Sequence, residues 1–92
     1  APERFYGQYS YASDLYSVGV LLFEMLMGYR PFSGVPKELM AAHLNQTAQI
    51  PPTLPFLLRS ILVTTLQKLP GHRYASTTAM LKAIRLAMEV EM

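Results

Sequence analysis

The sequence predicts an all-α fold of about four helices joined by irregular loops. Apolar residues recur at helical spacing in several segments, these segments are flanked by helix-capping residues, and no run shows the alternation of a β-strand. At 92 residues the chain forms one domain or part of one. Hydrophobic residues make up 51% of the chain and charged residues only 15%, so we expect apolar surface that meets another part of a larger protein.

The first helix is expected from about Asp14 to Met27. Ser13 provides a hydroxyl cap for its first turn, and Gly28 suits a left-handed residue at its end. The helix is apolar on nearly every side, which predicts that it is surrounded by protein. The preceding residues 1–12 have no clear period and are expected to form an ordered, irregular loop.

The second helix is expected to begin with Pro36 in its first turn and to run to about Leu44, with Asn45 near its end. Residues 29–35 before it are rich in turn formers. Residues 45–53 after it are polar and contain two prolines, which indicates an extended linker.

The third helix is expected from about Pro55 to Gln67, and Pro70-Gly71 is expected to end it. Ser76 is a good cap for a fourth helix. In the fourth helix one face is predicted to hold Met80, Leu81, Ile84, Ala87 and Met88, and the opposite side Lys82, Arg85 and Glu89.

Composition argues against several classes of function. The basic residues are spread along the chain without a stripe, so no nucleic-acid partner is expected. The longest apolar run, residues 18–27, is much shorter than the ~20 residues of a membrane span, and the N-terminus does not resemble a signal peptide. Because cysteine is absent and His43 and His72 stand apart, we expect no disulfide, no metal site and a cytoplasmic location.

Three motifs carry a resemblance to a known family. They are Ala1-Pro2-Glu3, then residues 13–28 (SDLYSVGVLLFEMLMG) followed by Arg30-Pro31-Phe32, and then residues 68–74 (KLPGHRY). Together and in this order they resemble eukaryotic-type Ser/Thr protein kinases, most closely the bacterial ones. Residues 1–92 would then be a partial kinase domain, the C-terminal helical subdomain of the C-lobe from the end of the activation segment to the last helix, cut from a longer chain.

The resemblance implies structural roles for three charged residues. Glu3 is expected to pair with Arg73 and so to join the activation segment to the helices below it, since carboxylate and guanidinium form directional, bidentate pairs. The alternative is that both are ordinary surface charges. Asp14, the only aspartate in the chain, matches a residue that supports the catalytic loop; its alternative role is that of a carboxylate at a helix N-terminus.

The resemblance and helix chemistry also single out two residues inside the first helix. Gly19 costs ~1 kcal/mol relative to alanine in a helix, which suggests close packing of another backbone. By resemblance, Glu24 contributes to recognition of a basic residue in a peptide substrate; its alternative role is a buried, hydrogen-bonded carboxylate. Leu69 departs from the family, which usually has an aspartate there, so a local hydrogen bond or charge at this turn is lost.

The chain lacks the groups that phosphoryl transfer requires. One aspartate cannot be both catalytic residue and metal ligand, and five scattered glycines make no phosphate-binding loop. We therefore expect no catalytic, cofactor-binding or metal residue here, and ATP and Mg²⁺ only in a parent Ser/Thr kinase. The expected partners are the remainder of the kinase domain and a protein substrate, with self-association through exposed apolar surface. The alternatives are a non-catalytic helical interaction module or part of a pseudokinase.

Overall fold

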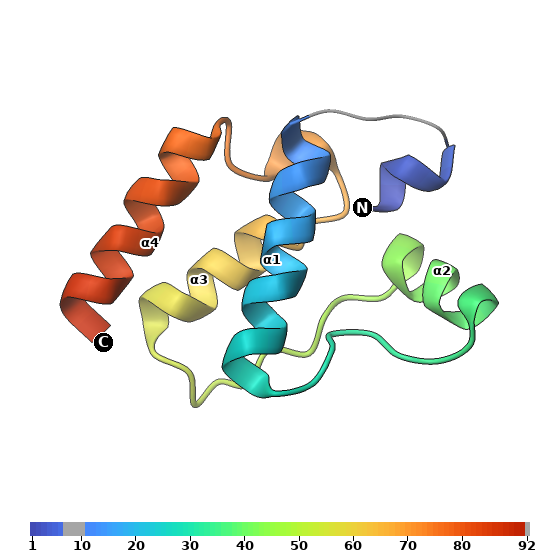
Figure 1. Ribbon diagram of the computed structural model, residues 1–92, viewed down its shortest axis with the longest axis horizontal. Coiled ribbons are helices and arrows are strands. Elements are labelled where there is room, and N and C mark those ends of the chain that lie inside the picture. The colour runs from blue at the N-terminus through green and yellow to red at the C-terminus, as the bar shows by residue number, and fades with distance from the viewer. Residues whose placement is uncertain (7–10, 92) are drawn as a thin grey trace.

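The computed structural model describes residues 1–6 and 11–91, and all regular structure in these ranges is helical. The elements are the 3₁₀ helix η1 (Pro2–Tyr6), α1 (Tyr11–Met27), α2 (Pro36–Asn45), α3 (Phe56–Thr65), the 3₁₀ helix η2 (Pro70–His72) and α4 (Thr77–Glu91). The predicted all-α class with four α-helices is confirmed. In Figure 1, α1 crosses α3 near the centre, α4 lies beside α3 at one end, and α2 lies at the other end.

The N-terminal boundary of α1 differs from the prediction. The helix begins at Tyr11, so Ser13 lies inside its first turn and the prediction that it precedes the helix is wrong. The Ser13 hydroxyl makes a long-range contact, since it donates to Glu3 Oε2 at 2.5 Å. The predicted loop over residues 1–12 is a 3₁₀ helix at Pro2–Tyr6, while residues 7–10 lie outside the described ranges.

The predicted end of α1 is confirmed. Gly28 has a φ of +79°, a left-handed conformation that a side chain would disfavour, and its amide donates to the carbonyl of Glu24 at 2.8 Å. The limits of α2 also agree with the prediction, since Pro36 opens the helix and Asn45 closes it. Gln46 then leaves the helix in an extended conformation and begins the predicted linker.

Helix α3 is shorter than predicted. It starts at Phe56 with Pro55 as N-cap and ends at Thr65, and Pro70-Gly71 belongs to η2 rather than to the end of α3. The cause lies outside the helix. The carbonyl oxygens of Gln67 and Lys68 accept hydrogen bonds from Arg73, so they turn toward the guanidinium instead of continuing the helix.

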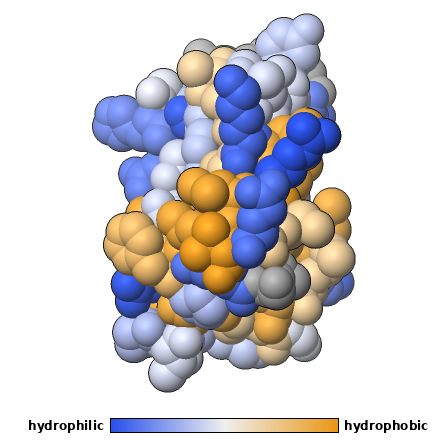
Figure 2. All heavy atoms as spheres, turned by 90° about the vertical axis from the view of Figure 1, so that its left-hand side faces the viewer, coloured by the Kyte–Doolittle hydropathy of each residue, from blue (hydrophilic) through white to orange (hydrophobic). Residues whose placement is uncertain are grey.

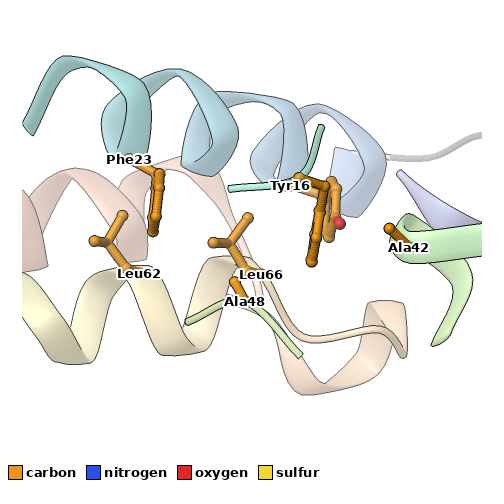
Figure 3. Close-up of a cluster of buried hydrophobic side chains, with 7 residues drawn as sticks. Tyr16, Phe23, Ala42, Ala48, Leu62 and Leu66 are labelled. Carbon is orange, nitrogen blue, oxygen red and sulfur yellow. The ribbon is translucent and has the colours of Figure 1, made fainter. Parts of the chain in front are cut away.

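Two groups of buried side chains hold the helices together, and α1 contributes to both. In the first, shown in Figure 3, Tyr16 and Phe23 point from α1 toward Leu62 of α3 and toward Leu66, the residue that follows α3. Its remaining buried members are Phe32, Ala42 and Ala48. The second group lies among α1, α3 and α4 and consists of Leu15, Leu58, Ile61, Met80 and Ala87.

The sequence predicted that α1 is surrounded by protein, but the described residues leave one side of the helix exposed. Val18, Leu21 and Met25 are 43%, 60% and 82% exposed, and their spacing places them on one face of the helix. Figure 2, a view from the α4 side, shows that hydrophobic residues are also exposed near the centre of that side of the molecule. The molecule therefore has apolar surface of the kind that its composition predicted. No helix in the described ranges has the length and apolar character needed to cross a membrane.

Helix α4 is capped as predicted, because the amide of Ala79 donates to Ser76 Oγ at 3.1 Å. Its predicted apolar face is only partly correct. Met80 and Ala87 are buried, whereas Leu81 and Met88 are about half exposed. Since α4 packs mainly against α3 and α1, the covered side of α4 is narrower than its apolar stripe.

The end of α4 caps the start of α3. Helix α3 has proline as its N-cap and no acidic residue in its first turn, so its first amides lack a local acceptor. Glu91 supplies one from more than thirty residues away, because its Oε2 accepts from Leu57 N at 2.7 Å and its Oε1 from Leu58 N at 2.9 Å. A carboxylate at this position also complements the positive end of the helix.

Gly19 lies where α1 and α3 approach most closely. A Cβ atom there would lie 2.4 Å from Thr65 Oγ1 and 2.7 Å from Thr65 Cβ. Both residues are buried, and the Thr65 hydroxyl is held by donation to the carbonyl of Ile61 at 2.9 Å. The close approach that was predicted for Gly19 is therefore present, but the neighbour is a threonine side chain rather than a backbone.

Replacing Gly19 by alanine is expected to destabilise the fold even though alanine favours helices. Overpacking of this kind typically costs about 1–3 kcal/mol, more than the gain in helix propensity of ~1 kcal/mol. Urea denaturation followed by circular dichroism measures the change. Thr65→Ala should partly restore the stability of Gly19→Ala, and Gly71→Ala, where a Cβ meets nothing within 4 Å, is the control. A Gly19→Ala chain more stable than the parent would contradict the close contact.

Glu91→Ala is expected to lower the free energy of unfolding by about 1 kcal/mol, the usual value of a helix cap. Glu89→Ala is the matched control, because Glu89 is an exposed carboxylate on the same helix. Amide hydrogen exchange of Leu57 and Leu58 should accelerate in the first variant only. Equal effects of the two substitutions would show that Glu91 does not cap α3.

Candidate functional site

The centre of the candidate site is a buried ion pair between residues 70 positions apart in the chain. Arg73 Nη1 donates to Glu3 Oε2 at 2.8 Å, and Arg73 Nη2 donates to Glu3 Oε1 at 2.9 Å. The side chains of Arg73 and Glu3 are 0% and 7% exposed. This is the bidentate arrangement that planar guanidinium and carboxylate groups favour. The structure thus brings together the two residues that the motifs had paired and excludes the alternative of surface charges.

Arg73 makes three further hydrogen bonds, all to backbone carbonyls. Its Nε donates to Gln67 at 2.8 Å, its Nη1 to Ala12 at 2.8 Å and its Nη2 to Lys68 at 3.2 Å. With the two bonds to Glu3, these use all five N–H groups of the guanidinium. One side chain therefore fixes η1, the first turn of α1 and the segment after α3 relative to one another.

The environment of Glu3 keeps its carboxyl group ionised. Burial alone would raise the pKa, but the hydrogen bonds from Arg73 and Ser13 outweigh it and lower the pKa to about 2. At neutral pH the pair is therefore a full ion pair. Its contribution depends on both partners, because removal of one leaves the other charge buried without compensation.

A second layer of contacts surrounds the ring of Tyr16, which is fully buried below the ion pair. The Arg73 guanidinium carbon lies 4.7 Å from the ring centroid and Lys68 Nζ lies 5.8 Å from it. The Tyr16 hydroxyl lies 2.8 Å from His43 Nδ1. Burial, with a further contribution from Glu3, raises the pKa of Tyr16 to about 12, so the phenol stays protonated and can donate to His43.

His43 and Lys68 connect α2 to this centre. Burial, with a further contribution from the Lys68 charge, lowers the pKa of His43, which favours the neutral imidazole. Lys68 Nζ donates to the carbonyl of Ala42 at 3.3 Å, near the end of α2, and lies 4.4 Å from the centroid of the Phe32 ring. Burial, followed by the nearby Arg73 charge, lowers the pKa of Lys68 to about 8.

The sequence did not predict a role for Tyr16, His43 or Lys68. Each had a weak signal, because Tyr16 and Lys68 lie inside two of the three motifs and His43 is the only histidine on a predicted helix. Periodicity could not show that these three side chains meet. They come from α1, α2 and the segment after α3, and only the tertiary structure places them together.

A cleft of about 260 Å³ opens between α1 and α2, next to this centre. It is lined by Val20, Glu24, Arg30, Pro31, Phe32, Leu39 and His43. Glu24 Oε1 lies 4.0 Å from Arg30 Nε, and 45% of the Glu24 side chain is exposed. The alternative of a buried, hydrogen-bonded Glu24 is therefore wrong, and its carboxylate is accessible at the cleft.

Asp14 lies in the first turn of α1 with an exposed side chain, so its position suits the helix N-terminus. Within residues 1–6 and 11–91, no three or more His, Cys, Asp or Glu side chains gather as metal ligands. The chain also has a single aspartate.

Arg73→Met is expected to lower the free energy of unfolding by roughly 3–5 kcal/mol, because it strands the buried Glu3 carboxylate and frees three backbone carbonyls. Arg85→Met is the control, since Arg85 is an exposed cation on α4. Chemical denaturation measures both changes. Adding Glu3→Gln to Arg73→Met should recover part of the loss, and additive losses would contradict a coupled pair.

Comparison with known proteins identifies the family. Residues 1–82 match the family described as "Protein tyrosine and serine/threonine kinase". The chain is 37% identical over 87 residues to the serine/threonine-protein kinase PknA of Corynebacterium glutamicum, a match that covers 91% of this chain and 19% of that protein.

Two relatives from Mycobacterium tuberculosis are also similar. PknA is 40% identical over 79 residues and PknE is 32% identical over 81 residues, each covering 83% of this chain, with 18% and 14% of the relative covered. No solved structure matches the chain significantly. The chain spans less than a fifth of the length of these curated relatives. Because the family match extends over most of its length, the chain belongs to the protein tyrosine and serine/threonine kinase family.

Proposed function

We propose that residues 1–92 are the C-terminal part of the C-lobe in a protein kinase that transfers the γ-phosphate of ATP to serine and threonine residues of proteins. The observation that carries the proposal is the buried Glu3–Arg73 pair, which joins the first and last of the three motifs. The relatives named as serine/threonine-protein kinases support the choice of substrate residue. The family match ends at residue 82 inside α4, and the helix continues without a break to Glu91, which supports one domain over the whole chain.

In this proposal the chain supports a catalytic apparatus that lies elsewhere in the parent protein. Glu3 closes the activation segment and Arg73 holds it against α1 and the segment after α3. Asp14, at the exposed start of α1, would accept hydrogen bonds from the catalytic loop. Because Leu69 replaces the usual aspartate, this turn contributes no carboxylate, and the Arg73 side chain holds it through the carbonyls of Gln67 and Lys68.

The remainder of the kinase domain is the partner that best explains the exposed face of α1. Val18, Leu21 and Met25 form an apolar stripe next to the first turn, where Asp14 would meet the catalytic loop. Cover from the rest of the domain would remove this stripe from water. Self-association through the same stripe and the cytoplasmic location both remain predictions. The family match does not favour the alternative of a non-catalytic helical module.

The parent protein would supply the residues that bind ATP and Mg²⁺. We therefore expect the longer protein to transfer labelled γ-phosphate to Ser and Thr of a general protein substrate. We also expect the 92-residue chain alone to show no saturable binding of Mg-ATP by calorimetry, because it offers no site for it. Micromolar binding by the isolated chain, or phosphate found only on tyrosine in the products of the longer protein, would contradict the proposal.

The cleft between α1 and α2 would hold part of the peptide substrate, with Glu24 binding a basic side chain. Glu24→Gln in the longer protein should raise KM for a basic peptide about tenfold, the value of one charge-assisted hydrogen bond, and leave kcat nearly unchanged. A peptide with alanine at the basic position should be insensitive to the substitution. Glu89→Gln on α4 is the control. Equal losses for both peptides would exclude Glu24 as a specificity residue.

A further inference from the structure

The segment between α2 and α3 has features of a β-strand without a partner strand. Gln46 is extended, with φ −93° and ψ 137°. Burial then alternates along the chain, since Ala48 and Ile50 turn toward the core while Thr47 and Gln49 are exposed. This two-residue period is that of an extended strand. Figure 1 shows the segment running back from α2 toward α3.

The backbone of residues 47–50 has no partner within the part of the chain that the structure describes. The last backbone hydrogen bond before this segment is donated by the Gln46 amide to the carbonyl of Ala42. The next one along the chain is donated by the Leu54 amide to the carbonyl of Pro51. Within the described ranges, no hydrogen bond involves the N–H or C=O groups of residues 47–50. Extended backbone with free donors and acceptors is a template for pairing with another extended chain.

A groove of about 320 Å³ runs along this segment, with α3 as its other wall. Helix α3 and the residues after it contribute Arg59, Val63, Leu66 and Gln67. Val63 is 45% exposed, so the groove offers an apolar floor beside the free backbone. This combination of main-chain groups and a shallow apolar pocket is the one used when a peptide adds to a sheet edge.

The charge of the groove favours an acidic occupant. Among the described residues that line it, Arg59 is the only charged one, and none is a carboxylate. The guanidinium is held at the rim, because Nη1 donates to the carbonyl of Pro52 at 3.2 Å and the group lies 5.8 Å from the centroid of the Phe56 ring. These contacts leave donors of the guanidinium for a carboxylate, which it binds with directional hydrogen bonds.

We propose that this groove binds an extended segment of a partner protein that carries an acidic side chain. The segment pairs with the backbone of residues 47–50, places an apolar side chain against Val63 and Ile50, and presents its carboxylate to Arg59. The site lies outside the α1–α2 cleft and does not depend on kinase activity, so it can be tested on the 92-residue chain itself.

The test uses the ¹⁵N-labelled chain and two blocked peptides, Thr-Val-Glu-Val-Thr and the same sequence with lysine in place of glutamate. We expect the acidic peptide to shift the amide resonances of residues 47–50 and to slow their hydrogen exchange, with at least fivefold weaker binding of the basic peptide. Shifts confined to other residues, or equal affinities for the two peptides, would overturn the proposal.

Two variants separate charge from shape, each with a matched control that leaves the groove intact. Arg59→Gln should abolish the preference for the acidic peptide, while Arg85→Gln on α4 should keep it. Val63→Lys should fill the groove and weaken binding of both peptides at least fivefold, while Val90→Lys, at an exposed valine of α4, should have no effect. Spectra of each variant report that it is folded. A folded Arg59→Gln chain that keeps the fivefold preference would refute the role of Arg59.

Discussion

The arrangement of the helices depends on satisfying one buried guanidinium. A charged group removed from water is tolerated only when its charge is paired and its donors are used. Arg73 meets this requirement with Glu3 and with the carbonyls of Ala12, Gln67 and Lys68. These partners come from three parts of the chain: Glu3 lies in η1, Ala12 in the first turn of α1, and Gln67 and Lys68 in the segment after α3. The early end of α3 and the position of η1 both follow from this one side chain.

The second constraint is that α1 contributes side chains to both hydrophobic cores. Tyr16 and Phe23 face α3 on one side, and Leu15 packs with the residues under α4 on another. Gly19 allows this because its missing side chain lets α1 approach Thr65. A helix used on several sides needs apolar residues nearly all around. The apolar face that remains exposed is therefore consistent with a lobe whose other half belongs to the parent kinase.

Local signals in the sequence predicted the helices well, and long-range contacts account for the errors. Gly28, Pro36 and Ser76 mark helix ends through groups within a few residues, so the structure confirms them. Ser13 was assigned as a cap because its hydroxyl suits one, but Glu3 accepts from it instead. The cap that Glu91 provides for α3 could not be predicted, since no local pattern links residues more than thirty positions apart. The contact between Glu3 and Arg73 could be predicted only from the family motifs.

The contacts of α2 connect the buried Glu3–Arg73 pair to the proposed substrate cleft. Among the other elements α2 packs mainly against η1, so its contacts with the core come largely from side chains. His43 meets the Tyr16 hydroxyl, and Lys68 holds the carbonyl of Ala42 while covering the Phe32 ring. His43 and Phe32 also line the cleft that contains Glu24. Because Arg73 stacks on the same Tyr16 ring, the wall of the cleft and the buried Glu3–Arg73 pair share one buried tyrosine. A change at either place can therefore reach the other through Tyr16, or through Lys68, whose carbonyl accepts from Arg73 and whose ammonium group donates to Ala42.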